Sequence, residues 1–146
     1  MEQKMDRRDW MKAMSAMAMV SLAGAGESAA QSSGGDETVY ELRMYHLNEG
    51  KLPLILERFR SKETAIFARY GMHGVGYWVP ADEPLAGRTI VYMLRHASRA
   101  AAAESWAKFT ADPEWVALKA ETEKDGAFVK LHESTFLKLA DFSPKL

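Results

Sequence analysis

Apolar and polar residues alternate along residues 38–47, which is the pattern of a half-buried strand. In an extended chain, successive side chains point to opposite faces. We expect the face toward the core to carry Tyr40, Leu42 and Met44. The other face then carries an acid, a guanidinium and a phenol in a row, Glu41, Arg43 and Tyr45. Three such polar side chains in succession on one face of a strand are unusual.

Apolar residues recur three and four positions apart between Leu52 and Tyr70, which predicts one amphipathic helix. Pro53 fits its first turn, and Gly71 follows as a C-terminal cap. Residues 72–79 form a second predicted strand. Two prolines in residues 80–87 then turn the chain.

Residues 88–96 predict a third strand that is apolar on both faces. Ser98 is a suitable N-cap for the alanine-rich helix that follows. Asp112-Pro113 interrupts this helix, and a second piece continues toward Lys124. Residues 128–139 form the last strand. The order β-α-β-β-α-β predicts an α+β, ferredoxin-like fold, with a four-stranded antiparallel sheet and two helices on one face.

The other face of such a sheet has no helix to cover it. Four strands spaced about 4.8 Å apart, each of about six residues, give a face of roughly 400 Å². A monomer seldom exposes that much contiguous apolar surface. We expect Val39, Val91 and Met93 on this open face. The simplest cover is a second copy, sheet against sheet, in a homodimer.

The composition of the chain argues against several classes of function. The chain has 146 residues, enough for one domain, with 19 basic and 20 acidic residues, so that nothing favours nucleic acid as a partner. There is no cysteine, which excludes disulfides, thiolate metal sites and a cysteine nucleophile. The sequence also has no glycine-rich phosphate loop and no serine-elbow motif.

Residues 1–30 resemble an export signal of the twin-arginine type. An Arg7-Arg8 pair is followed by Trp10, Met11 and Lys12, then by an uncharged apolar stretch and small residues. Cleavage could follow Ala25 or Ala30. The apolar stretch is shorter than the roughly twenty residues of a membrane span. We expect a periplasmic or secreted protein that meets the twin-arginine export machinery, has no stable membrane span after processing, and carries a flexible leader at 31–37.

Several short motifs in residues 38–146 together resemble the NIPSNAP family. They are Tyr40-Glu41-Leu42-Arg43-Met44-Tyr45, Gly50-Lys51-Leu52, Gly71-Met72 with Gly76-Tyr77-Trp78, Asp112-Pro113-Glu114-Trp115 and Phe142-Ser143-Pro144. The resemblance implies a dimeric α+β barrel. This agrees with the independent argument from the open face.

In such a dimer, Glu41, Arg43 and Tyr45 would point into a cavity between the two sheets. They are either a buried charged pair capped by a tyrosine, which fixes the strands, or a site that binds a ligand or transfers a proton. In the second case Arg43 would stabilise an oxyanion and Glu41 would orient it or accept a proton. Arg95 has the parity to join them.

Gly74, Gly76 and Trp78 would share one face of the second strand. Glycines inside a strand mark close approach of a ligand or of another backbone, so these residues are either a pocket wall or a packing contact. The four histidines have no metal-ligand spacing, and we expect no metal. One histidine is enough for haem, which stays the alternative to a cofactor-free site. Trp106, Phe109, Trp115 and Leu118 are expected in the core.

Two functions remain open at this stage. The first is an exported dimeric barrel that binds a small, mostly apolar molecule between its sheets, with cofactor-free oxygenase or isomerase chemistry suggested only by analogy of fold. The second is a non-catalytic protein–protein interaction module. Whether the protein is an enzyme is not decided by its sequence.

Overall fold

The computed structural model describes residues 37–146, so the predicted export signal and nearly all of the leader lie outside the described residues. The elements follow the predicted order, and each strand begins and ends within two residues of its predicted bounds. The strands are β1 (Val39–Leu47), β2 (His73–Trp78), β3 (Thr89–His96) and β4 (Val129–Leu137). The helices are α1 (Leu52–Arg58), the π-helical turn η1 (Phe59–Glu63), α2 (Thr64–Arg69), α3 (Arg99–Ala111) and α4 (Pro113–Thr122).

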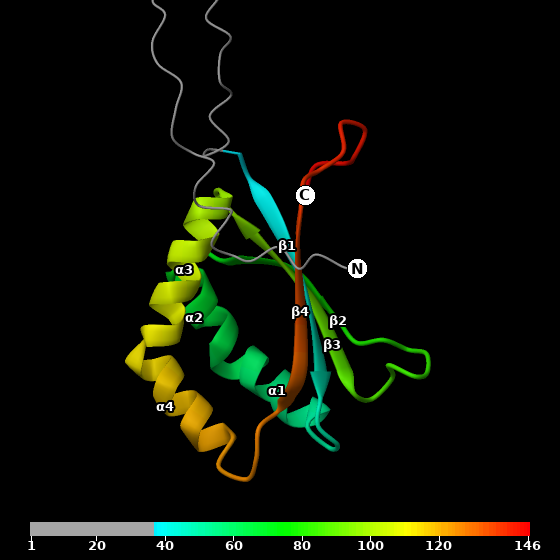
Figure 1. Cartoon of the computed structure of the whole chain (residues 1–146), viewed down its shortest axis with the longest axis vertical. Coiled ribbons are helices and arrows are strands. Elements are labelled where there is room, and N and C mark those ends of the chain that lie inside the picture. Colours follow the sequence, from blue (N-terminus) through cyan, green and yellow to red (C-terminus); the bar gives the residue numbers. More distant parts are fainter. Residues whose placement is uncertain (1–36) are drawn as a thin grey trace, which may run out of the picture. The chain divides into compact units, whose positions relative to one another are not determined.

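The four strands form one antiparallel sheet in the order β2-β3-β1-β4. All four α-helices lie on the same side of this sheet (Figure 1). The predicted fold class is therefore confirmed. It is the ferredoxin-like α+β arrangement found in one protomer of a dimeric α+β barrel.

Local signals in the sequence account for the helix ends. The Ser98 hydroxyl accepts a hydrogen bond from the Ala101 N–H at 3.0 Å and starts α3. Asp112 accepts bonds from the N–H groups of Glu114 and Trp115 at 2.7 and 3.1 Å, so it ends α3 and caps α4. Gly71 has a φ of 76°, which suits the C-terminal cap predicted for the first helix.

The core lies between the sheet and the helices. It is built around Ile55, Ile66, Phe67, Ile90, Tyr92 and Leu94, all of which are buried. Trp106, Trp115 and Leu118 pack against this cluster and Phe109 belongs to it, as predicted. Tyr92 has Phe67 and Tyr77 stacked against it at ring-centroid distances of 6.1 and 5.7 Å.

The prediction that Tyr40, Leu42 and Met44 face the helices is wrong. Arg43 pairs with Tyr92, and Glu41 pairs with Leu94. Directly paired residues of an antiparallel sheet share a face. The polar row of β1 therefore lies on the helix side, with the core residues of β3. Its charges are tolerated there because neighbouring elements supply hydrogen-bond partners, as described below.

Leu42 pairs with Met93 and Met44 with Val91, so the apolar residues of β1 lie on the open face. Val91 and Met93 lie on the open face as expected. Val39 does not, since it has the parity of the polar row and pairs with His96.

The predicted common face of Gly74, Gly76 and Trp78 is also wrong. The register shifts between Gly74, which pairs with Leu94, and Gly76, which pairs with Met93. This irregularity puts Gly74 on the helix side and leaves Gly76 and Trp78 on the open face. A Cβ atom at Gly74 would meet the Tyr77 phenol, and one at Gly76 would meet the Trp78 indole. Each glycine makes room for an aromatic ring of its own strand.

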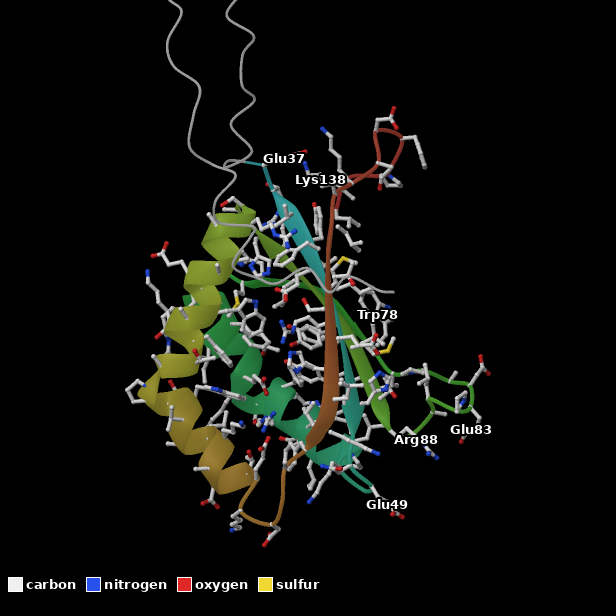
Figure 2. All side chains as sticks on the ribbon, in the orientation of Figure 1. Glu37, Glu49, Trp78, Glu83, Arg88 and Lys138 are labelled. Atoms are coloured by element: carbon white, nitrogen blue, oxygen red, sulfur yellow. The ribbon has the colours of Figure 1, made fainter. Side chains whose placement is uncertain are left out.

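The open face keeps several exposed apolar side chains. Trp78 is 51% and Leu131 57% exposed, and Trp78 points away from the helices (Figure 2). The C-terminal residues 138–146 form an apolar groove with Tyr40, Met93 and Leu137 at one end of this face, and Phe142 is 88% exposed. Within residues 37–146, no helix is both long and apolar enough to cross a bilayer.

Candidate functional site

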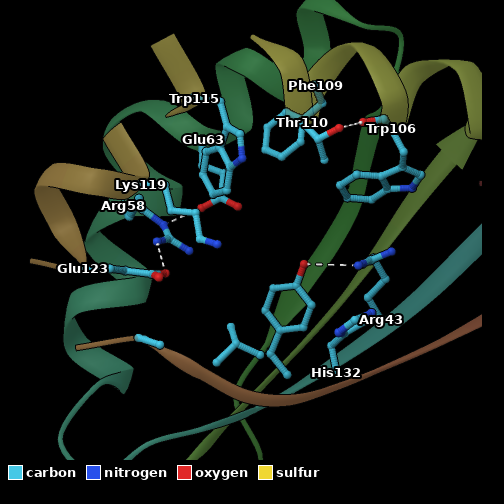
Figure 3. A pocket seen from close by; sticks show the side chains of 13 residues that line it. Arg43, Arg58, Glu63, Trp106, Phe109, Thr110, Trp115, Lys119, Glu123 and His132 are labelled. Atoms are coloured by element: carbon cyan, nitrogen blue, oxygen red, sulfur yellow. Dashed lines mark hydrogen bonds and ion pairs between the residues drawn. The ribbon is translucent and has the colours of Figure 1, made fainter. Parts of the chain in front are cut away.

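A pocket of about 480 Å³ opens between the helices and the β1–β4 side of the sheet. One wall is aromatic and consists of Trp106, Phe109 and Trp115. Five charged side chains also line it, namely Arg43, Arg58, Glu63, Lys119 and Glu123. Figure 3 shows Glu63 and Arg58 on one side of this space and Arg43 on the other. Mostly apolar walls with a few converging polar groups are typical of small-molecule sites.

The π-helical turn η1 places Glu63 in this pocket. The Thr64 N–H bonds to the Phe59 carbonyl five residues back, and the Thr64 hydroxyl donates to the same carbonyl at 3.0 Å. Single π turns inside α-helices occur often at functional sites. The Glu63 side chain is only 2% exposed, yet its carboxyl points toward the pocket (Figure 3).

Glu63 belongs to a buried charged cluster. Arg58 donates from Nε to Glu63 Oε2 at 2.8 Å and from its terminal nitrogen to Glu123 Oε1 at 2.8 Å. Its guanidinium also lies 5.0 Å from the Trp115 ring and 4.8 Å from the Phe128 ring. Burial raises the pKa of Glu63 to about 7, because the loss of water outweighs the attraction of Arg58. Glu63 can therefore both take up and release a proton near neutral pH.

Glu41 is equally buried, at 2%, but has many donors. Its carboxylate accepts hydrogen bonds from His96 Nε2 at 2.9 Å, Trp106 Nε1 at 2.7 Å and Ser134 Oγ at 2.7 Å, and it forms an ion pair with Arg43. Burial alone would raise its pKa. The bonds from His96, Ser134 and Trp106 and the charge of Arg43 instead lower the pKa of Glu41 to about 2.

Arg43 connects Glu41 to the pocket. Its guanidinium lies 4.2 Å from the Trp106 ring centroid and donates to the Tyr45 hydroxyl at 3.3 Å. Tyr92 in turn donates to Tyr45 at 2.7 Å. Burial works against the charge of Arg43, but the nearby Tyr92, Tyr45 and Glu41 raise its pKa, so the guanidinium stays charged. Its Nε has no partner among the described residues.

The structure thus brings Glu41, Arg43 and Tyr45 together, but on the helix side of the sheet. Arg95 does not join them. It pairs with Tyr40 and His73 on the open face and is exposed. Gly74, Gly76 and Trp78 are not among the residues that line the pocket.

Sequence reasoning missed Arg58, Glu63 and Glu123. One signal was present. The apolar stripe of the first helix has Ile55, Phe59 and Ile66, and a regular helix would place another inward position at 62 or 63. Lys62 and Glu63 stand there. An acid at a core position of an amphipathic helix marks either a buried pair or a site.

The histidines do not converge. His46 bonds to Glu133 at 2.6 Å, His96 bonds to Glu41, and His132 lines the pocket. Among residues 37–146, no group of three or more histidine or carboxylate side chains is placed to hold a metal ion. The absence of a cofactor stays a prediction.

Fold and site together define an α+β protein whose single sheet and helices enclose a charged, aromatic pocket. The NIPSNAP family model matches residues 40–144. The chain therefore belongs to the NIPSNAP family, and the resemblance noted in its sequence is confirmed.

Solved structures of NIPSNAP proteins are similar to this chain. One NIPSNAP family protein from Agrobacterium tumefaciens is 28% identical, with a TM-score of 0.64, over 74% of this chain and 98% of that one. A second from the same organism, described as of unknown function, is 27% identical, with a TM-score of 0.63, over 75% and 94%. An uncharacterized NIPSNAP-like domain protein from Burkholderia xenovorans is 21% identical, with a TM-score of 0.65, over 76% and 92%. No curated protein matches the chain.

Proposed function

We propose that the pocket between the sheet and the helices binds a small, mostly apolar molecule and that Glu63 removes a proton from it. The observation that carries this proposal is the placement of Glu63 by a π turn, with a raised pKa, at an aromatic pocket. A carboxyl group whose pKa lies near the working pH is well suited to general acid–base catalysis.

The pocket has the parts that removal of a proton next to a carbonyl or phenol requires. Glu63 takes the proton, and the electron pair of the broken C–H or O–H bond moves onto the substrate oxygen. Arg43 and Tyr45, across the pocket, stabilise the resulting oxyanion. Return of the proton to a different carbon gives an isomerase. Dioxygen can instead take electrons from the same anion and bond to its carbon, and after protonation the resulting hydroperoxide loses water to leave a carbonyl group, which gives a cofactor-free oxygenase.

This proposal moves the site from the space between two sheets, where the sequence placed it, to the inside of one protomer. The reason is the orientation of β1. Glu41, Arg43 and Tyr45 all lie on the helix side, and two of them line the pocket.

Solvent exchange tests the chemistry without knowledge of the natural substrate. The probe is 2-tetralone, an apolar aromatic ketone with acidic C–H bonds. In D₂O at near-neutral pH, the protein is expected to accelerate the loss of its α-proton NMR signals. Glu63→Gln is expected to lower this rate about a hundredfold, the usual size of a general-base effect. Glu133→Gln, which removes a carboxyl on the open face, is the matched control.

Equal exchange rates for the wild type and Glu63→Gln would contradict the role of Glu63. If exchange is accelerated, an oxygen electrode decides between the two outcomes of the carbanion. Consumption of dioxygen with 2-tetralone supports the oxygenase, and its absence during rapid exchange supports the isomerase.

A second candidate function rests on the open face. Its exposed Trp78 and Leu131, and the exposed Phe142 beside it, favour a surface that binds protein. We propose a second copy as the simplest occupant, and an unlike partner as the alternative that makes the protein an interaction module. Native mass spectrometry distinguishes them. A dimer that Trp78→Asp converts to a monomer supports self-association, whereas a monomeric wild type contradicts it.

Export through a twin-arginine signal is also a proposal. Its support is the residue pattern of 1–30 alone. Expression of the full chain in a bacterium tests it. Substitution of both Arg7 and Arg8 by Lys should retain the protein in the cytoplasm, whereas an unchanged location would contradict it.

A further inference from the structure

The charges on the pocket wall and directly behind it balance one another before any ligand enters. Three cationic side chains, Arg43, Arg58 and Lys119, line it. Three carboxyl groups oppose them. Glu63 and Glu123 contact Arg58, and Glu41 contacts Arg43 from behind the pocket wall. Lys119 has no ion pair among the described residues, but it is exposed, so water screens its charge.

Glu41 is the group that sets the charge next to Arg43. It lines no part of the pocket itself and is held in place by donors from three other elements, His96 of β3, Trp106 of α3 and Ser134 of β4. Arg43 cannot turn away from it easily, because the guanidinium also lies against the Trp106 ring. The positive charge that a ligand meets at Arg43 is thus already paired.

A preformed anion gains little from a guanidinium that is already paired with a buried carboxylate, yet it loses its own hydration on entry. A neutral ligand has a much smaller desolvation cost. Its oxygen can still accept a hydrogen bond from Arg43 or Tyr45, and it becomes charged only after the proton has moved to Glu63.

We infer that Glu41 is a specificity-determining residue: by balancing Arg43, it makes the pocket select neutral phenols and ketones over carboxylate anions of the same size. This inference rests on the function proposed above, since it names the substrate class of the same pocket. It assigns Glu41 an indirect role, exerted through Arg43, and not contact with the substrate.

The test compares two probes of matched shape, 2-naphthol and 2-naphthoate. At about pH 7.5 the phenol is neutral and the acid is ionised. Binding is followed by quenching of tryptophan fluorescence in the full chain. The wild type is expected to bind 2-naphthol at least about tenfold more tightly than 2-naphthoate. In Glu41→Gln this ratio should fall at least about tenfold, because Arg43 now carries an unbalanced charge.

Glu133→Gln is the matched control, since it removes the same charge from the same sheet without touching Arg43. Its ratio should equal that of the wild type. A Glu41→Gln ratio equal to the wild-type ratio, or a wild type that prefers 2-naphthoate, would overturn the inference. Failure of the wild type to bind either probe would instead contradict the pocket as a binding site, and the inference with it.

Glu41→Gln replaces an acceptor oxygen by a donor and can prevent folding. A double variant keeps the inference testable. In Glu41→Met/Arg43→Met both charges are removed together, so the local balance is retained and the probe ratio should stay within about threefold of the wild type. If the double variant preferred 2-naphthol over 2-naphthoate tenfold more strongly than the wild type does, Arg43 would act as an unbalanced anion site in the wild type. This result would overturn the inference.

Discussion

Glu41 and Glu63 are two carboxyl groups of the same molecule, each 2% exposed, whose pKa values move in opposite directions. Both side chains are shielded from solvent and both contact an arginine. Glu63 lies deeper in the protein and close to the negative charge of Glu123, and the two carboxyl groups also differ in their hydrogen bonds. Glu41 has three donors besides its arginine, whereas Arg58 is the one described residue that donates a hydrogen bond to Glu63.

Burial alone therefore does not decide the charge of a carboxyl group. A buried carboxylate with enough donors becomes a fixed structural anion, and one with few donors keeps a titratable proton. In this protein the first kind anchors the pocket wall and the second faces the pocket. The following predictions test this division of roles.

The largest effect is expected from removal of the fixed anion. Glu41→Ala would leave the Arg43 charge and three hydrogen-bond donors buried without an acceptor, which costs about 4 kcal/mol of the free energy of unfolding. Thermal unfolding followed by circular dichroism should show a fall in Tm of about 15 °C or more. A fall of only a few degrees would show that water replaces the carboxylate, and would contradict the role of Glu41 as a structural anion.

The titratable group should show itself in the pH dependence of stability. Between its ordinary value of 4.5 and about 7, Glu63 holds a proton in the folded state that the unfolded chain releases. Its contribution to stability is therefore complete below pH 4.5 and is lost as pH rises through 7. Denaturant titrations should show a loss on the order of 3 kcal/mol over this interval.

Glu63→Gln should lack this loss, while Glu133→Gln should keep it. For Glu41 we expect the opposite change at lower pH, where the free energy of unfolding should fall as the pH falls. Because its folded pKa is about 2, its contribution is complete above pH 4.5 and is lost as pH falls toward 2. Parallel profiles of wild type and Glu63→Gln from pH 4.5 to 7 would contradict the raised pKa of Glu63.

The smallest effect should come from removal of one of the four partners of Glu41. Ser134→Ala deletes a single neutral donor and leaves the carboxylate three others, so we expect a cost of about 1 kcal/mol. Urea titration measures it. A cost as large as that of Glu41→Ala would show that the hydrogen bonds to Glu41 are strongly cooperative, so that the loss of one disrupts the others.

Much of the fold follows from local signals. The helical period from Leu52 onward, the caps at Ser98 and Asp112 and the turn at Gly71 each have a direct physical reason, and each is confirmed. The family was recognisable for a similar reason, since its motifs lie at turns and strand positions that the fold requires.

The face of β1 could not be decided by the same means. The side chains on both of its sides are buried or half-buried, and the polar side is stable inside only because Trp106, His96 and Ser134, distant in sequence, supply donors. The alternation of residues fixes which side chains share a face but not which face meets the helices. The π turn and the irregularity in β2 shift the register by local geometry, which a regular period cannot show.

The C-terminal segment has a practical consequence for anyone who labels this protein. Residues 138–146 lie beside Tyr40 and Met93, at one end of the uncovered side of the sheet. A purification tag or fluorescent fusion attached after Leu146 would lie next to the open face, which we propose binds a second copy. Reporters are better inserted in the turn at 80–87, where they leave that surface open to its natural occupant.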